Sequence, residues 1–215
     1  MEVIALRLPF TEEQFLGVFA RYNEAIWPMQ IVAYVLAVAA VALAVRPRVW
    51  ASRIVAVVLA LMWLWTGWEY HIVYFAPINP AAKAFGALFI LEGLAFLATA
   101  AARPLTFGVR ADLFGVVGGA MILYAMVIYP MLGAALGRAF PESPSFGVTP
   151  CPVTIFTFGM LLWARETRWY LVVIPFAWSA IGFMAAVHLG VVEDTALLVV
   201  GLVGTVMLAV RGRRG

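Results

Sequence analysis

Apolar runs of about 20 residues, each long enough to cross a bilayer, succeed one another along almost the whole chain. Short polar turns separate them. The 215 residues are 65% hydrophobic and only 12% charged, and the mean hydropathy is +1.01, far above that of soluble domains. Because a segment inside a bilayer must satisfy its own backbone hydrogen bonds, we expect an all-α, polytopic transmembrane helical bundle.

Prolines and basic turns divide these runs and predict seven spans. The fifth is short: about 15 residues at 1.5 Å each give roughly 22 Å, which suits either a crossing or a re-entrant hairpin. If it crosses, ten of the fourteen Lys and Arg residues lie on one side, which the positive-inside rule makes cytoplasmic. We therefore expect the N-terminus outside and the C-terminus inside. The expected spans cover residues 27–45, 50–75, 81–102, 111–130, 150–164, 169–190 and 196–210.

The first 23 residues form a separate expected unit, an amphipathic segment that lies in the membrane interface. Thr11 and Gln14 have the spacing of a capping box, and Phe10 and Phe15 have that of a hydrophobic staple. Residues 24–215 then form a single transmembrane domain. This segment either only anchors the first span or has a gating or partner role.

The basic balance of the chain, a net charge of +3, does not indicate a nucleic-acid partner. The Lys and Arg residues lie in short turns between apolar runs, where they indicate topology rather than a binding patch. The expected partners are the lipid bilayer and a small solute or ion, with no nucleic acid. The oligomeric state stays open.

Two histidines and the single cysteine come out at a similar depth. His71 and His188 lie roughly 12 Å beyond the midpoints of outward-running spans, and Cys151 enters the fifth span from outside. Nitrogen and sulfur ligands in one layer suit copper, zinc or haem iron, and Gly67, one turn before His71, leaves room for a ring or an ion. Two polar residues at a tolerant depth and a cysteine that packs as a small hydrophobe are the alternative.

Cys151 also lies in a distinctive helix start, Thr149-Pro150-Cys151-Pro152. Thr149 can cap the helix and Pro150 fits its first turn. A thiol at that position is favoured as a thiolate, which suits a reactive or metal-binding group.

Two acidic residues are candidates for ion coupling or for a buried acid. Glu92 lies near the middle of the third span, where an unpaired charge is costly, so it needs a proton, a bound cation or a donor such as Tyr124. The alternative is a neutral acid that ties two helices together. Glu69 is about 200° from His71 around a straight helix, so these two residues cannot readily serve one site.

Two further features of the fourth span indicate packing. Gly115 and Gly119 form a GxxxG face that allows another helix to approach closely. Asp112 lies near the inner end of this span beside Arg110, and the two form an expected interfacial ion pair.

The order of short motifs along most of the chain resembles a bacterial multi-pass inner-membrane family of unknown function. The motifs are Leu8-Pro9-Phe10-Thr11, Gln14-Phe15, Val18-Phe19, Tyr22-Asn23 and Trp27-Pro28 near the start, then Thr149-Pro150-Cys151-Pro152 with Thr154 and the run 158–163. The resemblance implies the bacterial inner membrane as the location and implies no activity.

These features favour transport or sensing of a small solute or metal ion. A membrane-embedded redox protein that binds a transition metal or haem is one alternative, and a non-catalytic assembly partner is another. The sequence contains no phosphate loop, nucleophile elbow or HExxH motif, so whether the chain catalyses a reaction stays open.

Overall fold

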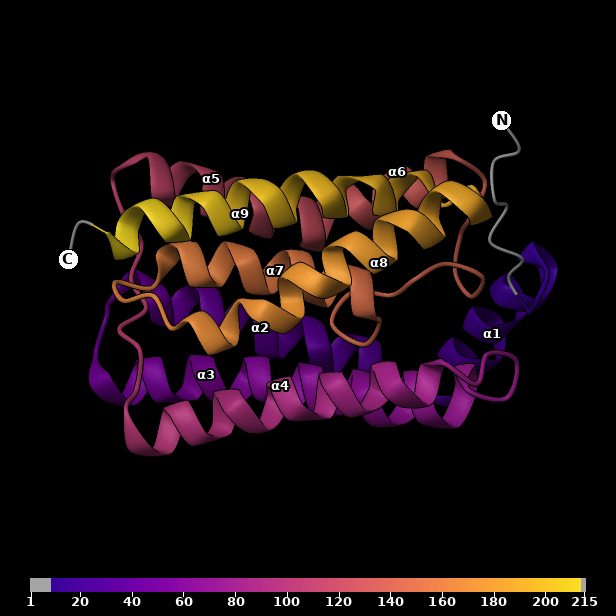
Figure 1. Ribbon diagram of the computed structural model, residues 1–215, viewed down its shortest axis with the longest axis horizontal. Coiled ribbons are helices and arrows are strands. Elements are labelled where there is room, and N and C mark those ends of the chain that lie inside the picture. The colour runs from indigo at the N-terminus through magenta and orange to yellow at the C-terminus, as the bar shows by residue number, and fades with distance from the viewer. Residues whose placement is uncertain (1–8, 214–215) are drawn as a thin grey trace.

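The computed structural model describes residues 9–213, and in this part of the chain long helices lie side by side along one axis (Figure 1). A shorter helix, α1, lies across one end. The helices are α1 (Glu12–Ala25), α2 (Met29–Val45), α3 (Val49–Trp65), α4 (Ala82–Ala102), α5 (Leu113–Leu123), α6 (Tyr129–Ala135), α7 (Pro150–Trp163), α8 (Val173–Leu189) and α9 (Ala196–Gly212). Two π-helical segments, η1 (Thr66–Phe75) and η2 (Tyr124–Ile128), and two 3₁₀ turns, η3 (Trp169–Leu171) and η4 (Val192–Thr195), complete the described elements.

The bundle is organised around α7, whose fourteen residues are all buried. It runs between α5 and α9 on one side and α3 on the other (Figure 1). A helix that is apolar all round has no face for water and belongs in the centre of a bundle. The expected fifth span, whose length suits either a crossing or a re-entrant hairpin, therefore forms the core of the molecule.

An irregular segment, residues 144–149, leads into α7 and is itself mostly buried. Buried irregular backbone needs hydrogen-bond partners within the protein. The Thr149 hydroxyl supplies one by donating to the Ser145 carbonyl oxygen at 2.8 Å. The expectation that the Thr149 side chain caps α7 is wrong, because its hydroxyl turns back to this segment and makes no cap hydrogen bond.

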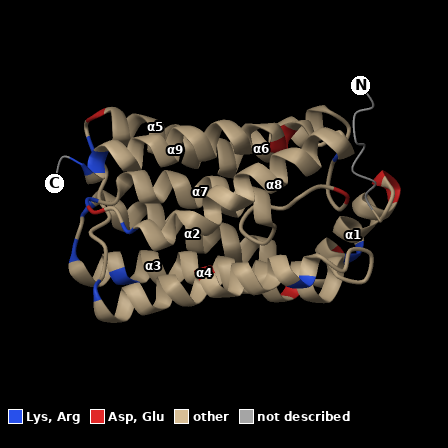
Figure 2. Cartoon of the chain, in the orientation of Figure 1, with Lys and Arg blue, Asp and Glu red and all other residues tan. Residues whose placement is uncertain are grey.

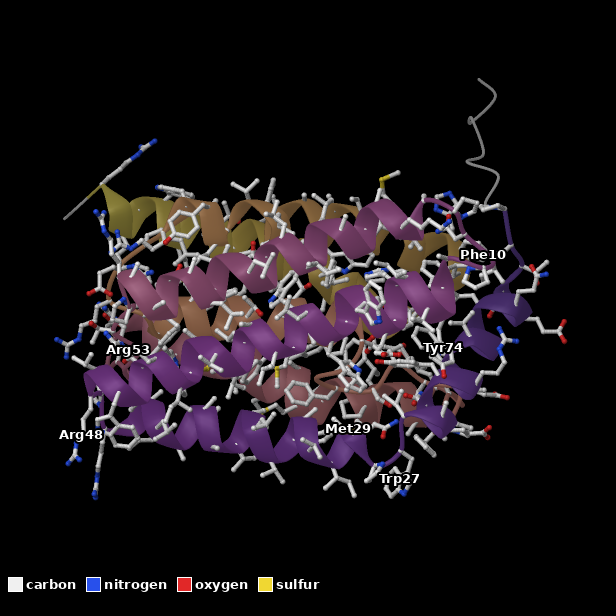
Figure 3. The ribbon with its side chains drawn as sticks, turned by 90° about the horizontal axis from the view of Figure 1, so that it is seen from below. Phe10, Trp27, Met29, Arg48, Arg53 and Tyr74 are labelled. Carbon is white, nitrogen blue, oxygen red and sulfur yellow. The ribbon has the colours of Figure 1, made fainter. Side chains whose placement is uncertain are left out.

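Among residues 9–213, five helical stretches are long and apolar enough to cross a membrane, and α1 with α2, bent by 82°, adds a sixth if the pair is one span. The five are Val49–Phe75, Ala82–Ala102, Leu113–Ala135, Trp169–Leu189 and Val192–Gly212. The apolar helix α7 is shorter. Blue Lys and Arg residues gather at the end that holds the C-terminus, whereas acidic residues predominate near α1 (Figure 2). Figure 3 shows the same polarity, with Arg48 and Arg53 opposite Phe10 and Trp27.

Glycines allow α5 and α7 to touch, but they are not the pair that the sequence indicated. A Cβ atom on Gly118 would lie 2.8 Å from the Gly159 carbonyl oxygen, so the two backbones are in direct contact. A Cβ on Gly119 would have only an ordinary contact, at 3.6 Å, and one on Gly115 would strike the Arg110 carbonyl in the preceding turn. The closest approach of the two helices is therefore at Gly118 and Gly159, while Gly115 of the predicted pair meets α7 through its carbonyl, which accepts from Trp163 at 3.0 Å.

Pro130 does not end its helix, because two neighbouring features accommodate it. The π-helical segment η2 widens the turn before the proline, and the helix continues as α6. A proline at this position cannot donate to the carbonyl four residues back, that of Met126. The Tyr34 hydroxyl donates to this carbonyl at 2.9 Å instead.

The predicted capping box and staple of α1 are confirmed. Thr11 and Gln14 exchange both hydrogen bonds, and the Phe10 and Phe15 rings stack with centroids 5.9 Å apart. The other end of α1 is tied to the bundle: Tyr22 donates to the Val148 carbonyl at 2.6 Å, and Asn23 donates to the carbonyls of Pro141 and Ser143.

The Arg110–Asp112 ion pair is also present, at 2.6 Å. Hydrogen bonds from Arg110 lower the pKa of Asp112, which in turn caps α5 by accepting from the Gly115 amide at 3.0 Å.

Candidate binding cavity at the α1 end of the bundle

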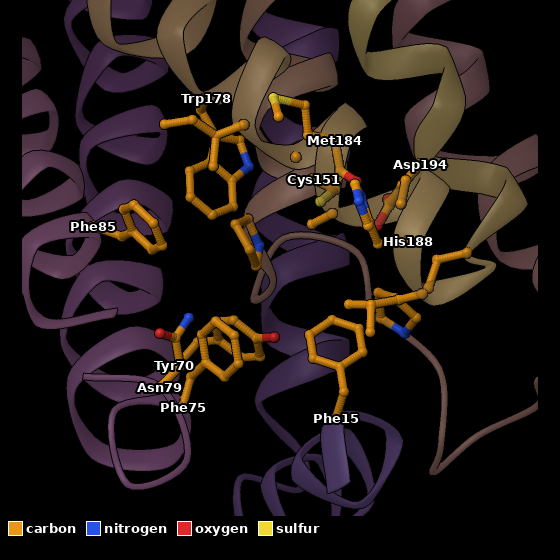
Figure 4. A pocket seen from close by; sticks show the side chains of 18 of the residues that line it. Phe15, Tyr70, Phe75, Asn79, Phe85, Cys151, Trp178, Met184, His188 and Asp194 are labelled. Carbon is orange, nitrogen blue, oxygen red and sulfur yellow. The ribbon is translucent and has the colours of Figure 1, made fainter. Parts of the chain in front are cut away.

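A cavity of about 340 Å³ lies at the end of the bundle that α1 covers. Residues of α1, η1, α4, α8 and η4 line it, together with the first turn of α7 (Figure 4). Its volume falls at the lower end of the range of small-molecule sites, about 300 to 1,000 Å³. The bundle thus holds a space of ligand size at its α1 end.

Aromatic side chains from four elements form a large part of the cavity wall. Phe15 and Phe19 come from α1, Tyr70 from η1, Phe85 from α4 and Trp178 from α8. Tyr70 stacks on Phe19 with centroids 5.5 Å apart, and Phe85 meets Trp178 edge to face at 5.4 Å. Such interlocked rings have few alternative rotamers, so the wall keeps its shape.

Asp194 is the one acidic residue among the described residues that line the cavity, and none of these is Lys or Arg. It lies in the turn η4 and is only 5% exposed. The Tyr129 hydroxyl donates to one of its carboxylate oxygens. Figure 4 places Asp194 across the cavity from Phe85 and on the same side as Cys151.

The neighbouring acid, Glu193, points away from the cavity and is fully paired. Arg138 donates to both of its carboxylate oxygens, at 2.5 and 3.2 Å, and these hydrogen bonds raise the pKa of Arg138. Tyr124 donates to the Glu193 backbone carbonyl at 2.8 Å. Tyr124 is therefore not the partner of Glu92 that the sequence suggested, because η2 faces η4 across this contact.

Two of the three predicted metal ligands line the cavity. Cys151 is buried in the first turn of α7, and His188 is exposed near the end of α8, where its Nδ1 atom lies 2.7 Å from the Met184 carbonyl oxygen. Among residues 9–213, no group of three or more His, Cys, Asp or Glu side chains is close enough to hold a metal ion. A metal or haem site here stays a hypothesis.

His71, the third predicted ligand, lies behind the aromatic wall. It is fully buried, and neither ring nitrogen has a partner among the described residues. Its ring contacts Trp178 and Phe89, with centroids 5.0 and 4.7 Å away. The predicted space beside it is filled: a Cβ on Gly67 would lie 2.9 Å from the Gly86 carbonyl oxygen, so this glycine lets α4 approach.

The two candidate acids lie apart from the cavity. Glu92 is fully buried in α4, and neither carboxylate oxygen has a hydrogen-bond partner among the described residues. Glu69 is half-buried in η1, a π-helical segment rather than the straight α-helix assumed from the sequence. Their ion-coupling roles stay predictions. A buried carboxyl group without hydrogen-bond partners lowers the stability of the folded protein, so packing alone does not account for Glu92.

The described parts of the two groups of motifs that carry the family resemblance, residues 9–28 and residues 149–163, meet at this cavity. Phe10, Phe15 and Phe19 of the first motif cover it, while Pro150 and Cys151 of the second form its floor. Tyr22 of the first motif joins the two by its hydrogen bond to the Val148 carbonyl.

Sequence reasoning missed Asp194 and Tyr129. Asp194 lies between the expected spans 169–190 and 196–210, and Tyr129 lies in the expected span 111–130, where neither residue belongs to a recognisable motif. The sequence signal for Asp194 was the Glu193-Asp194 pair directly before an apolar run. An acid next to a membrane span can accept hydrogen bonds from buried donors, so it is a candidate for a functional site.

Comparison with protein-family models matches residues 12–214 to a "Family of unknown function (DUF6064)". No curated protein and no solved structure matches the chain.

Proposed function

The chain belongs to this family of unknown function, and we propose that it is an integral membrane protein that binds a small lipophilic molecule in the cavity beneath α1, as a step in sensing or transport. The observation that carries the proposal is the cavity itself, whose volume of about 340 Å³ is bounded almost wholly by aromatic and aliphatic side chains. Apolar walls with a few placed polar groups are the usual design of small-molecule sites.

The proposed orientation follows from the distribution of charge. With the arginine-rich end in the cytoplasm, the cavity opens near the outer leaflet of a bacterial inner membrane. The proposed topology has seven crossings. In this arrangement the buried segment 144–149 and α7 together make the fifth, which explains how a helix of fourteen residues serves there. A lipophilic molecule then reaches the cavity from the bilayer or from the outer surface.

Glu92 supplies the second part of the proposal, coupling to a proton or a cation. Its carboxyl lies in α4, the helix that also contributes Phe85 to the cavity wall. Glutamine at this position keeps the size and the hydrogen-bonding groups but cannot titrate. Glu92→Gln should therefore leave binding to the cavity unchanged and abolish any proton-coupled step.

The redox alternative has weaker support. His71 is enclosed by aromatic rings and does not line the cavity that Cys151 and His188 share. Metal analysis and an absorption spectrum of protein purified without chelators test that alternative directly.

Equilibrium binding of a neutral probe tests the proposed function. Tritiated neopentylbenzene, measured by scintillation proximity on purified protein, should bind saturably at one site per chain. Ala185→Phe, which places a ring in the cavity, should abolish the saturable part. Ala180→Phe is the matched control, because Ala180 lies on the exposed face of the same helix. Purely non-saturable uptake, equal in all three proteins, would contradict the proposal.

A further inference from the structure

We propose that the natural ligand of the cavity is an amphiphilic cation, a molecule with an ammonium-type charge and an apolar body, and that Asp194 binds the charge. This inference rests on the proposed function of the cavity and adds the chemical class of its ligand. It follows from the only charged group on the described wall and from the kind of surface that surrounds it.

The Asp194 carboxyl group has no ion-pair partner among the described residues. Two ion pairs occur in the part of the chain that the structure describes, Arg110–Asp112 and Arg138–Glu193, and neither includes Asp194. Arg138 is occupied by both carboxylate oxygens of Glu193. The Tyr129 hydroxyl donates a hydrogen bond to Asp194, which supports a carboxylate but adds no charge.

The rest of the wall favours a cation over a neutral or anionic ligand. Faces and edges of Phe15, Tyr70, Phe85 and Trp178 surround the space (Figure 4). The face of an aromatic ring attracts a cation, and the attraction grows when water is excluded. An anion would meet the Asp194 carboxylate with no Lys or Arg among the described lining residues to offset the repulsion.

The size and polarity of the cavity define the rest of the ligand. The aliphatic side chains of Ile181, Met184 and Leu189 on α8 also line the cavity and suit a hydrocarbon body. An inorganic cation would leave this apolar surface without a partner. A lipophilic amine or quaternary ammonium compound fits both parts.

A pair of probes of the same shape separates charge from size. Benzyltrimethylammonium and neopentylbenzene differ in one central atom, nitrogen in the cation and carbon in the neutral compound. In the wild-type protein, the cation should bind at least about tenfold more tightly, a difference of about 1.4 kcal/mol. Asp194→Asn, which keeps an oxygen acceptor for Tyr129, should remove most of this preference, measured as the ratio of the two probes' affinities in the same variant. Glu69→Gln, which removes an acid outside the cavity, should change neither affinity.

Each outcome decides one of the two proposals. Saturable binding of neopentylbenzene with equal or weaker binding of the cation would overturn the cation inference and leave the cavity function intact. An unchanged cation preference in Asp194→Asn would overturn the role of Asp194. Absence of saturable neopentylbenzene binding would remove the proposed function, and with it the inference that rests on it. The wild-type comparison needs no variant, so it decides the charge preference even if Asp194→Asn fails to fold.

Discussion

Replacing Glu92 by methionine should stabilise the protein. The Glu92 side chain is fully buried, and both carboxylate oxygens lack partners among the described residues. Leaving a buried polar group unsatisfied costs about 1 to 3 kcal/mol, and methionine has a similar length without that cost. For a chain of this length, 1 kcal/mol corresponds to about 2 to 4 °C in Tm, so the rise should be roughly 2 to 12 °C.

Thermal unfolding of the purified protein in one detergent measures this shift, with Glu92→Gln as the control. Glutamine keeps a polar group without partners and should leave Tm nearly unchanged. A loss of more than about 1 kcal/mol in Glu92→Met would contradict the reasoning, because it would mean that the carboxyl makes a stabilising contact. Glu92 would then be the acid that ties helices together, and its proposed coupling role would lose its support.

Three further predictions follow from local contacts. In a denaturation assay, Gly118→Ala should destabilise the protein by about 1 to 3 kcal/mol, since the new Cβ would meet the Gly159 carbonyl oxygen in the α5–α7 contact. Gly119→Ala, whose Cβ would have only an ordinary contact at 3.6 Å, should be neutral or stabilising in the same assay. Tyr34→Phe should cost about 1 kcal/mol, and a double-mutant cycle should show a smaller cost in a Pro130→Ala background, where an amide can reach the Met126 carbonyl. Arg110 lowers the pKa of Asp112, so the pair stabilises the folded state fully above the pKa of Asp112 in the unfolded chain, about 3.9. This stabilisation is lost as the pH falls through the lower pKa of the folded state. Asp112→Asn should therefore remove this pH dependence from the free energy of unfolding.

The helical elements could be predicted from the sequence because hydrophobic runs, and the prolines and polar turns that end them, act locally. The expected span 81–102 corresponds to α4, Ala82–Ala102, and the run 50–75 to the continuous stretch Val49–Phe75. The cap of α1 was equally local, since it depends on Thr11 and Gln14 alone. Neither the π-helical character of η1 nor that of η2 has a comparable local signal, although Pro130 marks the place of η2.

The cavity could not be predicted because it depends on how distant segments meet. Cys151 and His188 were placed at one depth from helix lengths, and both line the cavity, but depth says nothing about rotation around each helix. His71 has the same predicted depth and lies behind Trp178 instead. Asp194 becomes notable only because η4 folds against Tyr129, sixty-five residues earlier in the chain.

Anomalous diffraction from crystals grown with 1-bromo-4-neopentylbenzene tests the central claim most directly, because the bromine atom reports where the molecule binds. The account predicts a bromine peak inside the cavity beneath α1, which is absent in Ala185→Phe crystals. Bromine peaks confined to the outward faces of the helices, with the cavity empty at saturating probe, would contradict it.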